Sequence, residues 1–236
     1  MKRIVLTLCL TISLAMGSFG IGLSGDFQKG LDAAQRGDYT TALKEWTSLA
    51  EQGDAKAQFN LGIMYERGQG VPQDYKTAVK WYALSAEQGD ALAQYNLGVI
   101  YDKGQGVLQD YKTAVKWYTL SAEQGYAKAQ FNLGFMYHNG QGVPQDYKTG
   151  VKWYTLAANQ GYVSAQYNLG VTYALGQGVI EDKVYAHMWA NIANSNGHEN
   201  GKKLMEFLLE QGITPSQIEK AQDLARECVK KEYKGC

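Results

Sequence analysis

Four asparagines at one constant spacing are the residues whose type and position most invite a chemical role. Asn60, Asn96, Asn132 and Asn168 follow one another at intervals of 36 residues. Asparagine is a mediocre helix former, so its return within a helical pattern requires a cause. A carboxamide both donates and accepts hydrogen bonds, and a row of them could bind the main chain of a peptide with little sequence preference. The same amides could instead bond to the backbone of a neighbouring helix, and the sequence leaves both alternatives open.

The other reactive side chains do not form a catalytic or metal-binding motif. The three histidines, His138, His187 and His198, do not recur at the 36-residue interval, and their spacing is not that of metal ligands. There is no nucleophile elbow, and the Gly-Gln-Gly run at residues 68–70 does not have the spacing of a phosphate-binding loop. We therefore predict a non-enzymatic protein with no catalytic residue, no cofactor and no metal ion.

Two cysteines close to the end of the chain could form a disulfide. Cys228 and Cys236 have seven residues between them. In an exported protein we expect them to pair, which would stabilise the last turn by about 2–3 kcal/mol through closure of a short loop. Two free thiols are the alternative, and it gains weight if the protein is not exported.

Residues 1–20 have the organisation of a secretory signal peptide. Two basic residues precede an apolar run over residues 4–15, and small residues follow. The run is too short to span a bilayer as a helix. We expect cleavage after Ala15 or Gly20, which leaves a mature chain, about residues 21–236, without a transmembrane segment and located in the periplasm or outside the cell.

The composition is that of a globular protein with balanced charge. The sequence is 45% hydrophobic, and 23 basic residues face 23 acidic ones. Nucleic-acid binding requires clustered positive charge, so we predict that nucleic acid is not a partner. The one basic cluster, Lys230, Lys231 and Lys234, is interpreted as a solvated last turn.

The middle of the chain is a tandem repeat. Residues 86–121 match residues 50–85 at 28 of 36 positions, residues 122–157 are a third copy, and residues 158–193 are a looser fourth. A period of this length predicts a solenoid. One domain is expected, with a degenerate first pair of helices over residues 26–49 and a C-terminal helical cap over residues 194–236.

Each copy is interpreted as two helices. In the first copy the pattern predicts a helix over Ala55–Arg67, which Gly68 ends with a positive φ. Asp74 is expected to cap the second helix. Gly62 lies in mid-helix at a cost of about 1 kcal/mol, and we expect it to allow two helix backbones to approach closely. The N-cap role is expected to recur at Asp110, Asp146 and Asp182.

Two further expectations concern the tryptophans and the C-terminal cap. Trp81, Trp117 and Trp153 each precede a tyrosine and could stack on carbohydrate, but we predict that they fill the core. In the cap we expect a turn over residues 194–201, then helices over about 202–211 and 215–231. The second of these begins with a threonine N-cap, a proline and a capping-box glutamine.

The repeat pattern resembles that of the Sel-one-like repeat family, which is related to the tetratricopeptide repeats. The resemblance implies an all-α, right-handed solenoid of stacked antiparallel helix pairs and a role in protein–protein interaction. The fourth copy departs from the pattern near Ala186 and Trp189, which suggests a transition towards a cap. The resemblance is carried in the first copy by Ala57, Leu61, Gly62, Tyr65, Gly68, Gly70, Val71, Asp74, Ala78, Trp81 and Tyr82.

The resemblance also implies a concave ligand-binding face. In tetratricopeptide units the ligand-facing positions fall two residues before and two after the Leu-Gly pair. Lys56 and Lys128 stand three residues before two of these positions and could attract an acidic group. Packing between adjacent repeats is the alternative role of the same aromatic residues. Carried over to this sequence, the positions are Phe59, Ile63, Tyr95, Val99, Phe131, Phe135, Tyr167 and Val171.

These observations predict an exported, monomeric, non-enzymatic solenoid that binds a protein or peptide on its concave face as an adaptor or scaffold. One alternative is a cell-wall-related enzyme or a β-lactam-binding or β-lactam-hydrolysing protein, as described for some cysteine-rich relatives. Those relatives have a cysteine pair in each repeat, and no repeat here contains a cysteine. A secreted factor that acts on host proteins is a third possibility.

Overall fold

The computed structural model describes residues 20–236, with side chains described from residue 27 onward. Residues 1–19, which include Cys9 and nearly all of the expected signal peptide, lie outside the described residues. Within the described part no helix is long and apolar enough to cross a membrane.

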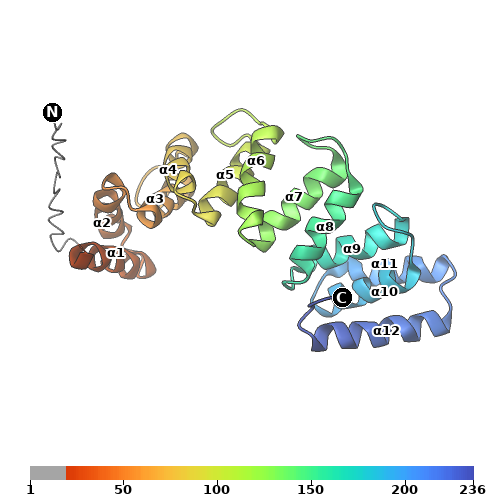
Figure 1. Ribbon diagram of the computed structural model, residues 1–236. Helices are drawn as coiled ribbons and strands as arrows, with labels where there is room; N and C mark the ends of the chain where they lie inside the picture. The colour runs from red at the N-terminus through yellow and green to blue at the C-terminus, as the bar shows by residue number, and fades with distance from the viewer. Residues whose placement is uncertain (1–19) are drawn as a thin grey trace, which may run out of the picture.

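The described residues form twelve α-helices and no strand, and successive helices pack as antiparallel pairs along a curved path (Figure 1). This arrangement confirms the prediction of an all-α solenoid. The helices are α1 (Gly20–Gln35), α2 (Tyr39–Glu51), α3 (Ala55–Arg67), α4 (Tyr75–Glu87), α5 (Ala91–Lys103), α6 (Tyr111–Glu123), α7 (Ala127–Asn139), α8 (Tyr147–Ala158), α9 (Val163–Leu175), α10 (Lys183–Ser195), α11 (Glu199–Glu210) and α12 (Pro215–Lys230).

The hydrophobic core lies between repeats as well as within them. Tyr82 and Ala86 of α4, for example, share one buried cluster with Leu97 and Ile100 of α5, which belongs to the next copy. Neither helix could bury this surface alone, so the stability of each pair depends on its neighbours.

The predicted helix ends are confirmed. Helix α3 spans Ala55–Arg67, and Gly68 follows it with a φ of 67° while its N–H bonds to the Met64 carbonyl. The Asp74 carboxylate accepts hydrogen bonds from the N–H groups of Lys76 and Thr77 at the start of α4. The same capping role is filled by Asp110, Asp146 and Asp182.

The recurrent mid-helix glycine, Gly62 in the first copy, has a different structural role from the expected close approach of two helix backbones. A Cβ atom added at Gly62 would lie 2.5 Å from ring atoms of Tyr82, and one added at Gly98 would overlap the ring of Tyr118. In the first two copies the glycine therefore makes room for an aromatic ring rather than for a second helix backbone, and in the third Gly134 is approached by the Tyr154 ring and also by the Gly150 carbonyl oxygen. Only Gly170 is approached mainly by backbone atoms, since Ala190 replaces the tyrosine there.

The predicted placement of the tryptophans in the core is also wrong for the regular copies. Tyr82, Tyr118 and Tyr154 are fully buried, whereas the preceding tryptophans are half-buried. Trp81 packs against the cluster formed by α1, α2 and α3, and the equivalent tryptophans likewise contact the preceding repeat. The three tryptophans therefore cover contacts between successive repeats and remain partly exposed to solvent. The buried tryptophans are Trp46, in the first pair of helices, and Trp189.

The C-terminal cap differs from expectation in one boundary and in its packing. Helix α11 begins at Glu199 instead of near residue 202, because it keeps the 36-residue interval from the start of α9. Helix α12 begins at Pro215 with the predicted capping box and lies along α10 (Figure 1). Helix α10 is thus surrounded by α9, α11 and α12, which explains its departure from the repeat pattern.

The expected disulfide is present in the cap. Cys228 is buried in the cluster that joins α12 to α10, and it is bonded to Cys236. The bond ties the last residues of the chain to the end of α12.

A pair of glycine-to-alanine substitutions tests the role of the mid-helix glycine. We expect Gly98→Ala to lower the free energy of unfolding by about 1–3 kcal/mol, because the added methyl group overlaps the Tyr118 ring. We expect Gly150→Ala to change it by less than about 1 kcal/mol, because the better helix propensity of alanine is set against a Cβ atom 3.1 Å from the Gly134 carbonyl oxygen. Ala78 and Ala114 fill the position of Gly150 in earlier copies. Denaturant titration measures both, and a stabilising Gly98→Ala would contradict the assignment.

Candidate functional site

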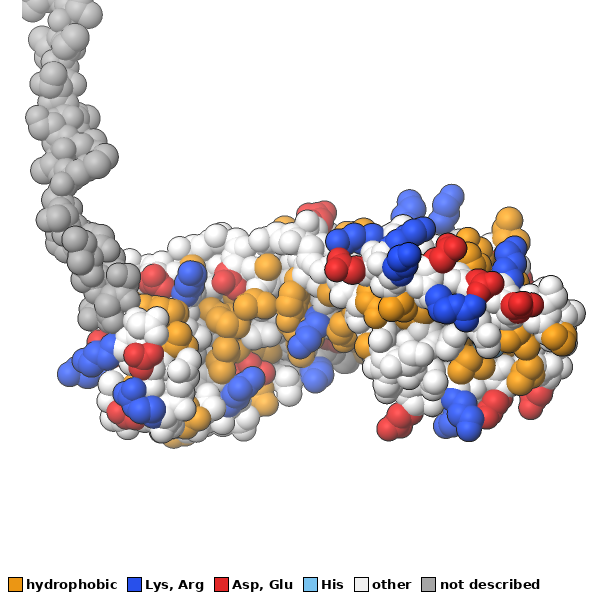
Figure 2. Space-filling view, turned by 90° about the horizontal axis from the view of Figure 1, so that it is seen from below, with side chains coloured by type: hydrophobic (Ala, Val, Ile, Leu, Met, Phe, Trp, Pro, Cys, Tyr) orange, Lys and Arg blue, Asp and Glu red, His pale blue; other side chains and the backbone are white. Residues whose placement is uncertain are grey.

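The predicted ligand-facing residues all lie on the first helices of the pairs. We call the surface formed by α3, α5, α7, α9 and α11 the first-helix surface. Most of the predicted residues on it are partly exposed, while Lys56, Lys128 and Phe135 are exposed, Phe135 at 44%. Figure 2 shows hydrophobic side chains gathered along the middle of one face of the molecule, with a hollow before the block of C-terminal helices.

The aromatic residues of this surface are held in place by the repeats. The Tyr95 ring lies 5.9 Å from the ring of Tyr118 in its own copy and 5.1 Å from that of Tyr126, which precedes the next first helix. Phe131 repeats this arrangement with Tyr154 and Tyr162 at 5.8 and 5.1 Å. The rings therefore pack against adjacent repeats and remain partly exposed, so they form a rigid apolar row. Phe59 and Tyr167 extend it through contacts with Tyr82 and His198.

The buried tyrosine hydroxyls and the repeated asparagines form a polar array under this row. Tyr82 donates a hydrogen bond of 2.5 Å to the Glu66 carboxylate, and Asn96 of the next copy interacts with the same hydroxyl. Burial and the adjacent Glu66 raise the pKa of Tyr82 well above its ordinary range. Tyr118 is bonded in the same way to Asp102, at 3.3 Å, and interacts with Asn132. These contacts give the asparagines a structural partner that the sequence did not reveal.

The third copy has the tyrosine but lacks the carboxylate. His138 stands where Glu66 and Asp102 stand in the earlier copies. Tyr154 interacts with Asn168, and burial raises the pKa of Tyr154 to about 12 without any contribution from a carboxylate. Burial also lowers the pKa of His138, whose Nδ1 atom is buried and has no hydrogen-bond partner among the described residues.

A cavity opens at this position. It has a volume of about 180 Å³ and lies between α7, α8 and α9. A second cavity of about 260 Å³ adjoins it between α9 and α11 and shares Val171 with it. The first cavity is lined by Phe135, His138, Asn139, Tyr154, Asn168, Val171 and Thr172, and the second by Tyr167, Val171, Ala174, Leu175, Lys203, Leu204 and Phe207.

The structure thus brings together only part of the predicted site. Phe135, Tyr167, Asn168 and Val171 line the two cavities. The other predicted residues lie outside them: Lys56, Phe59, Asn60, Ile63, Tyr95, Asn96, Val99, Lys128, Phe131 and Asn132. Sequence reasoning missed Leu175 and Phe207, which are 53% and 38% exposed at the second cavity. Leu175 departs from the repeat pattern, because the earlier copies have polar residues at its position. Phe207 stands 36 residues after Val171 and could have been found by extending the interval into the cap, and the change from acid to histidine at position 138 was also visible.

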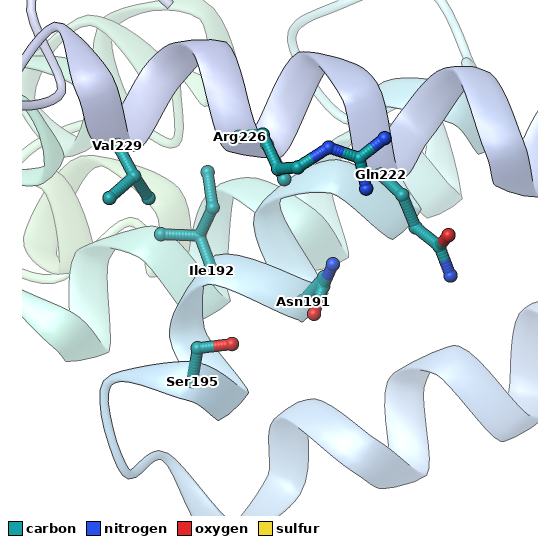
Figure 3. Close-up of a pocket in the computed structure, with 7 residues that line it drawn as sticks. Asn191, Ile192, Ser195, Gln222, Arg226 and Val229 are labelled. Carbon is teal, nitrogen blue, oxygen red and sulfur yellow. The ribbon is translucent and has the colours of Figure 1, made fainter.

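A larger cavity lies elsewhere and offers little chemistry. It has a volume of about 430 Å³ and lies between α10 and α12, where Ile192 and Val229 supply apolar surface (Figure 3). Arg226, its one charged lining residue, is paired with Asp223 on the same helix. Across the described residues, no group of three or more His, Cys, Asp or Glu side chains is placed to hold a metal ion.

Comparison with known proteins gives a family and several structural relatives. The family model of the Sel1 repeat matches residues 55–90, 91–126, 127–162 and 163–198. No curated protein matches the chain. A protective antigen present in uropathogenic Escherichia coli strains, which displays an SLR fold, is 33% identical with a TM-score of 0.79 over 89% of this chain. A Sel1 repeat protein from Oxalobacter formigenes is 30% identical with a TM-score of 0.70 over 88% of this chain and 77% of its own.

The match covers only part of the antigen's length. The chain covers 47% of the antigen, so the antigen contains about as much sequence again outside the matched part. The similarity therefore concerns most of this chain and about half of the antigen.

The asparagines can be tested by comparing two copies. We expect Asn132→Ala to lower the free energy of unfolding by about 1 kcal/mol, because the amide interacts with the buried hydroxyls of Tyr118 and Tyr95. Asn60→Ala is the matched control with a smaller effect, since Trp46 replaces the tyrosine of the preceding pair. Urea titration gives both values. Equal losses would show that the tyrosine contact does not explain the asparagines.

Proposed function

Because the chain belongs to the Sel1 repeat family, whose members are generally non-enzymatic scaffolds for protein–protein interaction, we propose that it binds a segment of a protein partner on the first-helix surface between α7 and α11. The single observation that carries the proposal is the pair of adjoining cavities that share Val171. We call the two adjoining cavities together the groove, and their lining residues come from the first helices α7, α9 and α11 and from α8.

The chemistry of this groove suits a peptide segment with apolar side chains. Phe135, Leu175 and Phe207 are exposed large hydrophobic residues at its rim, and such exposure on a folded protein is typical of an interaction site. The Asn168 amide lines the first of the two cavities and can bond to a main chain. Grooves with apolar anchors at intervals bind extended peptides or single helices.

The cellular role that fits this groove is that of an exported adaptor or scaffold. The signal-peptide pattern of residues 1–20 supports a periplasmic or secreted location. The disulfide between Cys228 and Cys236 is consistent with an oxidising compartment. Fractionation of cells that express the full chain tests the location, and a product of full precursor mass in the cytoplasm would contradict export.

The groove can be mapped by site-specific crosslinking in living cells. A photo-crosslinking amino acid at Val171 should capture a discrete partner, because this residue lies in both cavities. The same amino acid at Leu156, which is 46% exposed on the second helix α8, is the matched control and should capture none.

A double variant in the groove should weaken this capture. Phe135→Ala with Leu175→Ser removes two exposed apolar anchors, and we expect capture at Val171 to fall by about tenfold or more. Leu156→Ser should leave capture unchanged. Circular dichroism must show that all variants are folded. Undiminished capture by the groove variant would place the binding surface elsewhere.

A further inference from the structure

The cavity between α7, α8 and α9 occupies the place of a carboxylate that the chain supplies itself in the two preceding copies. We infer that this cavity binds a carboxylate of the partner segment, which takes the position held by Glu66 and Asp102 in those copies. This inference rests on the proposed function and specifies which chemical group the groove recognises.

The equivalence of the three positions is given by the repeat. Residues 66, 102 and 138 are separated by 36 residues each, as are Tyr82, Tyr118 and Tyr154. In the first two copies the tyrosine hydroxyl donates to the carboxylate across the helix pair. In the third copy the carboxylate is replaced by His138, while Gly134 still makes room for the tyrosine ring. The ring of Tyr154 therefore keeps its position, but its hydroxyl no longer has a carboxylate at position 138 to donate to.

Three groups that can donate hydrogen bonds surround the cavity. Tyr154, Asn168 and His138 all line it, and the hydroxyl, amide and imidazole groups of these side chains can each donate a hydrogen bond. The other polar residues are already engaged, since Thr172 donates to the Leu169 carbonyl and Asn139 to the Phe135 carbonyl. A carboxylate accepts several hydrogen bonds at once, so it matches this set of donors.

The surroundings favour one negative group from outside. Burial lowers the pKa of His138 and keeps its imidazole neutral, and no carboxylate among the described residues contributes to that shift, so a carboxylate here would be recognised through hydrogen bonds. Phe135 and Val171 provide apolar surface next to the donors, which suits the carbon atoms that carry a carboxylate. A volume of about 180 Å³ leaves room for both parts.

The fourth copy shows what happens when both members of the pair are lost. Ala174 and Ala190 stand in place of the acid and the tyrosine. Leu204 of α11 reaches this position, with its Cδ2 atom 3.0 Å from the place of a Cβ on Gly170. An apolar side chain thus fills the space there, and the polar cavity belongs to the third copy.

Three short probe peptides test the inference. They are acetyl-Leu-Leu with a free carboxylate, the same peptide as its C-terminal amide, and acetyl-Leu-Glu-Leu-amide. Binding is followed by NMR through the side-chain signals of Asn168 and His138 in the full protein. We expect at least one carboxylate-bearing peptide to bind about tenfold or more tightly than the uncharged amide. The better of the two shows whether a chain terminus or an acidic side chain is the source.

Substitutions at the position of the missing acid make the test specific. His138→Glu restores the arrangement of the first copy, so its own carboxylate should occupy the site and abolish the preference for carboxylate peptides. His138→Gln adds no charge and should retain it. Tyr154→Phe removes the hydroxyl but keeps the ring on Gly134, and binding should weaken several-fold. Tyr82→Phe, the same change at the closed first copy, is the matched control and should have no effect.

The possible results separate this inference from the proposed function. If the amide binds as tightly as the acids, or if His138→Glu binds them like the unaltered protein, the carboxylate inference is wrong. The proposed function still stands in that case if the crosslinker at Val171 captures a partner. If no probe binds and the crosslinker captures nothing, both are overturned.

Discussion

The packing and the candidate site of this solenoid both depend on one contact, in which a tyrosine ring lies on the helix backbone at a glycine. At Gly62, Gly98 and Gly134 the absence of a Cβ atom lets the ring of the partner helix lie directly on the first helix. Protein interiors are packed so densely that one added methyl group would destabilise the protein at this contact. The ring in turn fixes its hydroxyl between two copies, where a residue of the first helix and an asparagine of the next copy can reach it.

Because the ring is fixed, a change in its polar partner creates a site and leaves the packing intact. The partner is glutamate in the first copy, aspartate in the second and histidine in the third. The shorter aspartate side chain lies farther from the hydroxyl than the glutamate does, at 3.3 Å against 2.5 Å. With histidine the bond is absent and a cavity remains. An identical scaffold therefore carries a closed contact in two copies and an open one in the third.

The sequence was sufficient to predict those features that depend only on neighbouring residues. The glycine at the end of α3 and the aspartate caps are determined by a few adjacent residues, so Ala55–Arg67 and Asp74 could be predicted correctly. The choice between Trp81 and Tyr82 as the buried ring could not, because neighbouring helical positions both border the apolar stripe. The packing of α12 on α10 depends on contacts between distant segments. Within the site, the repeat pattern pointed to Phe135, Asn168 and Val171, whereas the role of Tyr154 required knowledge of how two helices meet.

The asparagines can therefore pack against neighbouring residues in some copies and bind a ligand in another. In the first copies the tyrosine is satisfied by its own carboxylate, so Asn96 and Asn132 complete a closed network. Asn168 makes the same approach to Tyr154, but there the network lacks its acid. A carboxylate supplied by a ligand would take the place of that acid and would accept charge-assisted hydrogen bonds from the same groups. An asparagine that completes a packed network in one copy is thereby available to bind a ligand in another copy. The single change from an acid to histidine at position 138 is enough to separate packing from ligand binding.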